Sequence, residues 1–174
     1  IAQYRKEGTP GGRIRVKGVV THQRPGADIF LHDATGGLQV KCRDTNNYAP
    51  GEVVEAIGFP DLERFLPVLH DAILVRTKES RELTHSRVVS LQELLDGFHH
   101  SDQITIQGKL LERSVRPVGS PNARPPQLTS TLTLQNSNFL FTAEVTSTNG
   151  FAELASVPNG SVVEVSGICL LQLG

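Results

Sequence analysis

Short segments in which apolar and polar residues alternate recur along the whole chain. The first covers residues 13–21, where Ile14, Val16 and Val20 alternate with charged and polar neighbours. A period of two predicts a β-strand that buries one face. Similar segments, separated by turn residues, follow at 29–32, 38–43, 52–59 and 68–75. The first half of the chain therefore predicts five short strands.

The second half begins after a polar connection. Residues 77–87 carry charges without a period and predict a linker. Ser90 and Glu93 have the spacing of a capping box, which predicts a short helix that ends near Gly97. Alternating segments return at 103–112, 129–134, 138–145 and 162–171. Four strands are expected here, one fewer than in the first half.

Two motifs occur once in each half. The segment GEVVEAIG at 51–58 returns as GSVVEVSG at 160–167, and IRVKG at 14–18 returns as ITIQG at 104–108. Each copy opens with an alternating strand and closes with a strand that contains Val-Val-Glu, and each of these strands ends at a glycine. We therefore expect two β-units of one topology, in which Val54 corresponds to Val163 and Glu55 to Glu164.

Five short strands, with a connection after the third and a Pro-Gly entry to the fourth, favour a small partly open Greek-key barrel of the OB type. A β-sandwich generally has about seven strands. The expected fold class is all-β, with two tandem OB-like five-stranded Greek-key barrels joined by a linker with a short helix. The expected boundaries are 1–79 for the first barrel with a polar N-terminal lead-in, 80–100 for the linker and capped helix, and 101–174 for the second barrel. The second barrel is expected to be truncated before its last strand.

Composition narrows the functional classes only a little. A net charge of −1 and a pI near 6.7 give no general attraction to a polyanion. The chain has no methionine, which indicates a segment excised from a longer polypeptide. Its two cysteines, Cys42 and Cys169, lie one in each half on apolar strand faces. They are therefore expected to be buried and free of a disulfide.

No arrangement of residues indicates catalysis, a cofactor or a metal ion. The chain lacks a Gly-x-Ser-x-Gly elbow, a phosphate-binding loop and a His-Glu-x-x-His motif. If the first hairpin turns around residues 24–26, His22 is expected to pair near Asp28 and His32 near Gly18. The two histidines would then lie about 13 Å apart, too far to share a metal ion. Glu55 and Glu164 occupy equivalent places in separate units, so they are not an acid/base pair. We expect a binding module without a cofactor.

The outward face of the first three strands is one candidate binding surface. It comprises Arg15, Lys17, Phe30, His32, Gln39 and Lys41. In OB folds this face commonly carries the ligand, and hydrogen-bond donors beside an exposed Phe30 favour a small anionic or polyhydroxylated molecule. The alternative is that these charges are simply solvated, or discourage pairing with other chains.

A long segment between the first two strands of the second half is the other candidate. Residues 114–128 contain four prolines, and Arg113, Arg116 and Arg124 lie in or beside this segment. Long loops without secondary structure are generally functional or disordered, and an OB loop at this place flanks the ligand face. A disordered insertion without a role is the alternative.

An OB protein that binds single-stranded nucleic acid or an oligosaccharide is the alternative function. Nucleic-acid sites of this kind combine a basic groove with aromatic rings on which the bases stack. The chain has no Trp, two Tyr and seven Phe, and only Phe30 falls on the candidate face. No nucleic-acid partner is therefore expected.

The order of the motifs resembles the tandem OB-like extracytoplasmic sensor region of bacterial sensor histidine kinases of two-component signalling. The segments that carry the resemblance are IRVKGVVT (14–21), IFLHDATGG (29–37), PGEVVEAIG (50–58), VSLQELLDG (89–97) and VEVSGIC (163–169). The resemblance extends over residues 13–171 and concerns structural positions. The long Pro-rich segment and the early end depart from the pattern of this family.

The resemblance implies an extracytoplasmic input module of a membrane-bound histidine kinase, on the periplasmic side of the inner membrane. The kinase catalytic domain would lie outside this chain, and no histidine here resembles the phosphoacceptor. The implied partners are an unknown small molecule or periplasmic protein and the rest of the kinase chain. A homodimer would form through the parent kinase.

Overall fold

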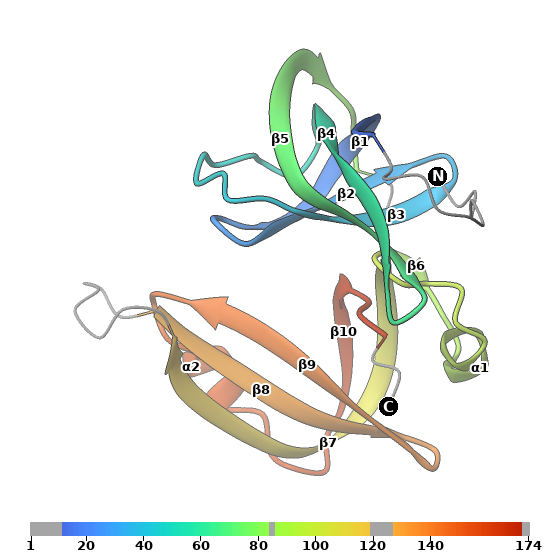
Figure 1. Ribbon diagram of the computed structural model, residues 1–174. Helices are drawn as coiled ribbons and strands as arrows, with labels where there is room; N and C mark the ends of the chain where they lie inside the picture. Colours follow the sequence, from blue (N-terminus) through green and yellow to red (C-terminus); the bar gives the residue numbers. More distant parts are fainter. Residues whose placement is uncertain (1–11, 84–85, 119–126, 172–174) are drawn as a thin grey trace. The chain divides into compact units, whose positions relative to one another are not determined.

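Figure 1 shows the computed structural model of the chain, which describes residues 12–83, 86–118 and 127–171. Strands form nearly all of its regular structure, and the helices are short. The chain folds as two compact units, Ile1–Ile104 with Ser166–Gly174, and Thr105–Val165. The prediction of an all-β chain is confirmed.

Five strands of the first unit close into a barrel. They are β1 (Ile14–Arg24), β2 (Asp28–Asp33), β3 (Gly36–Lys41), β4 (Glu52–Glu63) and β5 (Leu66–Ser80). The order around the barrel is β1, β2, β3, β5, β4, and β4 pairs again with β1. All pairs are antiparallel except β3 with β5, where Gln39 lies opposite Val68 in parallel strands. This order is that of an OB barrel, which confirms the expected fold class.

Alternation along these strands directs one side of each into the barrel. The five strands each contribute a side chain that is at most 1% exposed, namely Val20, Ile29, Val40, Val54 and Leu69. Burial of such a side chain stabilises a fold by about 1.5–3 kcal/mol. Gly18 lets β1 and β2 approach, because a Cβ at this position would lie 3.0 Å from the Cβ of Leu31.

The pairing of β1 with β2 differs from the expected register. His22 lies opposite Phe30, whereas the turn composition predicted Asp28 as its partner. The hairpin closes at the pair Arg24 and Asp28, and the register shifts at a bulge between Val20 and His22. A bulge inserts one extra residue into a strand, and the alternation of residue types alone does not reveal it.

A short capped helix follows the first barrel, as predicted. Strand β6 (Arg87–Val88) leads to α1 (Leu91–Leu95). The amide of Glu93 donates to Oγ of Ser90 over 3.3 Å, and the amide of Ser90 donates to Oε2 of Glu93 over 2.8 Å. Gly97 follows the helix with a φ of 82°. The capping box and the glycine stop are both confirmed.

The strands of the second unit form an open sheet. It contains β7 (Gln103–Val118), β8 (Gln127–Asn136), β9 (Phe139–Ser147) and β10 (Val162–Ile168), with α2 (Ala152–Ala155) between β9 and β10. The order is β10, β7, β8, β9. The corresponding order in the first unit is β4, β1, β2, β3, which is the barrel without β5. The two-residue strand β6 also pairs with β7, outside this order. Among the described residues no strand joins β9 to β10, and β7 to β10 are the four strands predicted.

Two backbone hydrogen bonds show that the units repeat residue by residue. The amide of Gly51 donates to the carbonyl oxygen of Val20 over 2.9 Å, and the amide of Gly160 donates to that of Leu110 over 2.7 Å. The two glycines have φ angles of 95° and 94°. Position 51 therefore corresponds to position 160, and position 20 corresponds to position 110.

The side chains beside these bonds match as well. Lys17 lies opposite Glu55 in the pairing of β1 with β4. In the second unit, Nε2 of Gln107 donates to Oε2 of Glu164 over 3.4 Å. Since Lys17 and Gln107 hold the same place in the repeated motif, the correspondence of Glu55 with Glu164 is confirmed.

The region between β7 and β8 departs most from expectation. The segment 114–128 was expected to be a long loop, but β7 continues to Val118 and pairs with β8 from Gln127 onward. Pro117 lies within β7, opposite Leu128. Proline is tolerated in a strand where its missing amide is not needed for pairing. The Ser, Thr and Val residues around it favour strands, and this preference outweighs the proline.

Candidate ligand-binding groove

The cations expected on the outward face of β1 are held by carboxylates. Nη1 of Arg15 lies 3.4 Å from Oε2 of Glu55. Nζ of Lys17 donates to Oε1 of Glu79 over 2.6 Å, and this bond lowers the pKa of Glu79. The positive charge that the sequence placed on this strand is therefore locally compensated.

Lys41 on β3 is compensated in the same way. Its Nζ donates to Oε1 and Oε2 of Glu63 over 2.5 and 2.6 Å. This hydrogen bond is the main reason that the pKa of Glu63 is lowered. Nε2 of His70 also lies 2.9 Å from Oε1 of Glu63, yet it makes no hydrogen bond among the described residues. The His70 and Glu63 atoms are therefore close to each other but not aligned for a hydrogen bond.

Phe30 is buried, which corrects the expectation of an exposed aromatic ring. Its side chain is 1% exposed. The ring centroid of His22 lies 6.1 Å away, and the guanidinium of Arg24 lies 6.0 Å from the ring centre. The bulge in β1 brings His22 opposite Phe30, so residues of the first hairpin cover the ring. Phe30 is not available for stacking on a ligand.

The buried carboxylate of Asp28 binds side chains of β1 and β3. Asp28 is 3% exposed and accepts hydrogen bonds from the guanidinium of Arg24 and, over 2.9 Å, from Nε2 of Gln39. Gln39 therefore keeps its carbonyl oxygen and its second N–H for another partner. Asp28 was not among the sequence-predicted site residues. A cation and a carboxylate on either side of a hairpin turn, here Arg24 and Asp28, could have indicated this ion pair.

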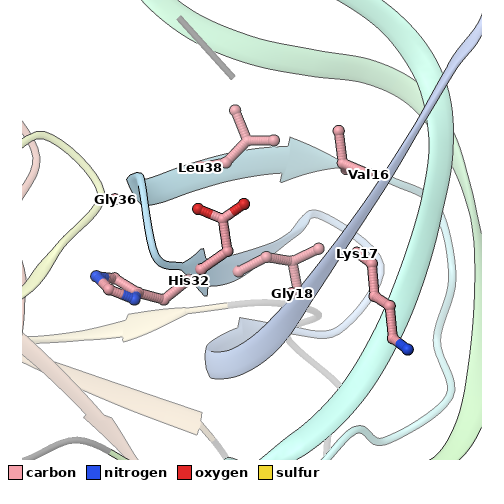
Figure 2. Close-up of a pocket in the computed structure, with 8 residues that line it drawn as sticks. Val16, Lys17, Gly18, His32, Gly36 and Leu38 are labelled. Carbon is pink, nitrogen blue, oxygen red and sulfur yellow. The ribbon is translucent and has the colours of Figure 1, made fainter.

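His32 turns toward the segment that follows α1. Its Nε2 lies 3.6 Å from Oδ1 of Asp102. The same Oδ1 accepts the amide of Gly37 over 2.7 Å, and Nδ1 of His99 lies 3.2 Å from Oδ2. Figure 2 shows His32 and Lys17 pointing apart around a shallow depression beside Gly18. This depression has no room for a water molecule, so it is not a ligand site.

The arginines expected in the Pro-rich loop have structural partners. Arg113 lies on β7 and donates to the carbonyl oxygens of Leu154 and Ala155 at the end of α2. Arg116, also on β7, lies 3.5 Å from Oε1 of Glu144. A cation at a helix C-terminus satisfies exposed carbonyls. Arg124 lies outside the described residues.

A groove of about 480 Å³ lies in the first unit. Its lining residues come from β3, from the β4–β5 turn, from the segment after α1 and from the segment after β10. They are Gln39, Glu63, Arg64, Leu66, Pro67, Val68, His100, Leu170 and Leu171. Of the sequence-predicted site residues that the structure describes, the groove contains Gln39 alone.

The β4–β5 turn forms one wall of this groove. Arg64 and Phe65 have φ angles of 48° and 68°, a region that residues other than glycine seldom adopt. Phe65 is 88% exposed at the tip. Backbone strain of this kind concentrates at functional sites. Strands were expected at 52–59 and 68–75, so the connection between them is shorter than expected. Its strained tip was not predicted, because residues 60–67 contain no glycine.

The opposite wall is held by a short ladder of hydrogen bonds. The amide of Ser101 donates to the carbonyl oxygen of Cys169 over 2.7 Å, and the amide of Cys169 donates to that of Asp102 over 2.9 Å. The amide of Leu171 donates to Nδ1 of His100 over 3.2 Å. Burial lowers the pKa of His100, which keeps its ring neutral, with Nδ1 as an acceptor and Nε2 as a donor.

The cysteines carry no sign of nucleophilic chemistry. Both are free, Cys42 buried and Cys169 half-buried. Burial raises the pKa of Cys42, and it raises the pKa of Cys169 to about 11. Both groups therefore remain thiols at neutral pH. Within the described ranges, no group of three or more His, Cys, Asp or Glu side chains is arranged to hold a metal ion, and no helix is long and apolar enough to cross a membrane.

Comparisons with known proteins add little to this description. No protein-family model matches the chain, and no curated protein matches it. A solved structure that it resembles is a chain from a replication protein A heterotrimer bound to ssDNA, with 15% identity and a TM-score of 0.37. The match covers 83% of this chain and 41% of that chain, so this chain spans less than half of its neighbour's length. The strand order and register identify the chain as a tandem of two OB-like units.

Proposed function

We propose that this chain is a non-catalytic binding module whose ligand occupies the groove of the first unit. The observation that carries the proposal is the groove itself. Its volume of about 480 Å³ falls in the range of small-molecule sites, about 300–1,000 Å³. Such sites combine apolar walls with a few polar groups, and this groove has both.

The lining suggests an uncharged ligand with an apolar body. Five of the nine lining side chains are apolar. The carboxylate of Glu63 is already compensated by Lys41, and Arg64 also has an interaction within the protein, so neither charge calls for an oppositely charged ligand. Nε2–H of His100 can donate to an acceptor atom of the ligand, and the carbonyl oxygen of Gln39 can accept from a donor atom of the ligand. These two hydrogen bonds would fix the orientation of the ligand.

Single-stranded nucleic acid fits this unit less well. Binding to the phosphate backbone needs available cations and exposed aromatic rings. On the face of β1 to β3, Lys17 and Lys41 are held by Glu79 and Glu63, and Phe30 is buried. The exposed ring of Phe65 belongs to none of these strands and lies at the tip of the β4–β5 turn. The chain would have to break these ion pairs in order to bind a polyanion.

We further propose that the module is the input region of a membrane-bound two-component histidine kinase and works outside the cytoplasmic membrane. The sequence resemblance supports this proposal. Ligand binding would act by favouring one of two arrangements of the chain. Sequencing the natural gene on both sides of this segment tests the proposal, because it requires a membrane-spanning segment and a kinase core. A gene that encodes neither would overturn it.

Thermal-shift screening with uncharged metabolites and oligosaccharides, followed by calorimetry, tests the binding site. A ligand at a hundred times its dissociation constant stabilises the protein by about 2.7 kcal/mol. We expect the stabilisation to vanish in Leu66→Arg and Leu170→Arg, which fill the groove. It should persist in Leu140→Arg, an exposed position on β9. A ligand that stabilises all three variants equally would place the site elsewhere.

A further inference from the structure

The second unit has an unfilled place where the first unit has a strand. In the first unit, β5 lies between β3 and β4, parallel to β3 and antiparallel to β4. In the second unit, β9 and β10 take the places of β3 and β4. No strand among the described residues lies between them. Each therefore has one edge whose backbone amides and carbonyls lack a strand partner.

The core of the second unit is incomplete at this same place. The buried members of its hydrophobic cluster are Leu110, Leu132 and Leu134, all on β7 and β8. The inward residues of β9 and β10 are only partly buried, namely Phe141, Ala143, Val163 and Val165. Their counterparts in the first unit are Leu38, Val40, Val54 and Ala56, which are 3% exposed or less. The two strands that flank the gap are thus less buried than their counterparts in the first unit. Leu154 and Val157 of the α2 segment are also only partly buried.

The charge beside the gap also differs from that of the first unit. Glu144 on β9 and Glu164 on β10 lie on the outward sides of the flanking strands. Position 144 corresponds to Lys41, so the first unit has a cation where the second has a carboxylate. Glu164 has an uncharged partner, Nε2 of Gln107 at 3.4 Å. Nη2 of Arg116 on β7 lies 3.5 Å from Oε1 of Glu144, so the outward side of the gap carries two carboxylates against one guanidinium. It would attract a basic partner.

We propose that this gap binds one extended polypeptide strand, parallel to β9 and antiparallel to β10, with apolar residues at alternate positions and basic residues between them. The apolar residues complete the core, as Leu69, Ala72 and Leu74 of β5 do in the first unit. The basic residues face Glu144 and Glu164. Addition of a strand to open edges gives affinity through main-chain hydrogen bonds and specificity through alternate side chains.

A labelled synthetic peptide that alternates valine or leucine with lysine is the probe, used with the intact chain. We expect saturable binding by fluorescence anisotropy. Hydrogen exchange should show new protection of backbone amides in β9 and β10, and none in β1 to β5. The same peptide with N-methylated backbone amides should bind at least roughly tenfold more weakly, because it cannot pair with both edges.

Two further variants separate strand addition from non-specific attraction. Glu144→Gln with Glu164→Gln should weaken the lysine peptide several-fold, whereas Glu112→Gln, an exposed position on β7, should not. A peptide with the same composition but with its apolar residues in one block should not protect β9 or β10. Equal binding of the N-methylated peptide, protection outside the two strands, or no binding up to millimolar peptide would each overturn the proposal.

Discussion

The amide of Leu171 donates a hydrogen bond to Nδ1 of His100 over 3.2 Å. Both residues line the groove of the first unit, although 71 positions separate them in the sequence. An imidazole accepts a hydrogen bond at Nδ1 only while that nitrogen is deprotonated. This wall of the groove therefore depends on the charge state of one histidine.

The stability of the protein should fall as the pH drops below about 6.5, because burial holds the pKa of His100 below its ordinary value of 6.5. The unfolded chain takes up the proton at a higher pH than the folded chain does, so the stabilising contribution is complete above 6.5 and is lost on acidification. Burial lowers the pKa of His22 in the same direction. Urea unfolding between pH 7.5 and 5.5 measures the slope.

His100→Asn is the matched variant for this measurement, since an Asn side-chain oxygen can accept from Leu171 without titrating. We expect a shallower pH slope in the variant than in the wild type. An unchanged slope would show that His100 does not contribute.

Asp102 should be important for the stability of the first unit. Its Oδ1 accepts the amide of Gly37 over 2.7 Å, and Asp102→Ala would leave that amide without its partner. We expect a loss of about 1–3 kcal/mol in the free energy of unfolding. Asp102→Asn, which retains an acceptor oxygen, should lose less. Chemical denaturation of the two variants makes the comparison, and equal losses would contradict the assigned role of the hydrogen bond.

Gly51 and Gly160 should both lose stability on substitution by alanine, and Gly51 should lose more, because its Cβ would lie 3.0 Å from the carbonyl oxygen of Arg81. Their φ angles of 95° and 94° lie where a Cβ is strained, so each change should cost about 1 kcal/mol or more. Gly167→Ala is the control, because a Cβ there meets nothing within 4 Å and its φ is not in the left-handed region. Thermal unfolding measures all three. A neutral Gly160→Ala would mean that the second unit does not depend on the repeated turn.

Both cysteines should react slowly with thiol reagents in the folded protein. Cys42 is 5% exposed, and burial raises the pKa of Cys169 to about 11, so neither presents a thiolate at pH 8. Labelling should become fast in urea. Rapid labelling of either residue in the native protein would contradict the burial described here.

The sequence predicted those features that depend on local pattern. Alternation located the strands, and the repeated Gly-x-Val-Val-Glu motif correctly placed Val54 on Val163, because both copies begin at a glycine with the same backbone requirement. The Ser90 and Glu93 spacing predicted the capping box for the same reason. Each of these signals lies within a few consecutive residues.

The features that were missed depend on contacts between distant segments. Phe30 falls on the outward side of β2, but a bulge in β1 covers it with His22. The charges of Lys17 and Lys41 are visible in the sequence, while their partners Glu79 and Glu63 lie 62 and 22 positions away. The groove joins Gln39 to Leu171, a combination that no local pattern indicates.

Nuclear magnetic resonance shows whether a small uncharged molecule binds in the groove of the first unit. Two-dimensional ¹⁵N–¹H spectra of the intact chain would be recorded with a library of small uncharged fragments. We predict that binding fragments shift the amide signals of Gln39, Val68, His100 and Leu171, and that Leu66→Arg abolishes these shifts. Shifts that cluster on β7 to β9 and survive in Leu66→Arg would contradict the account.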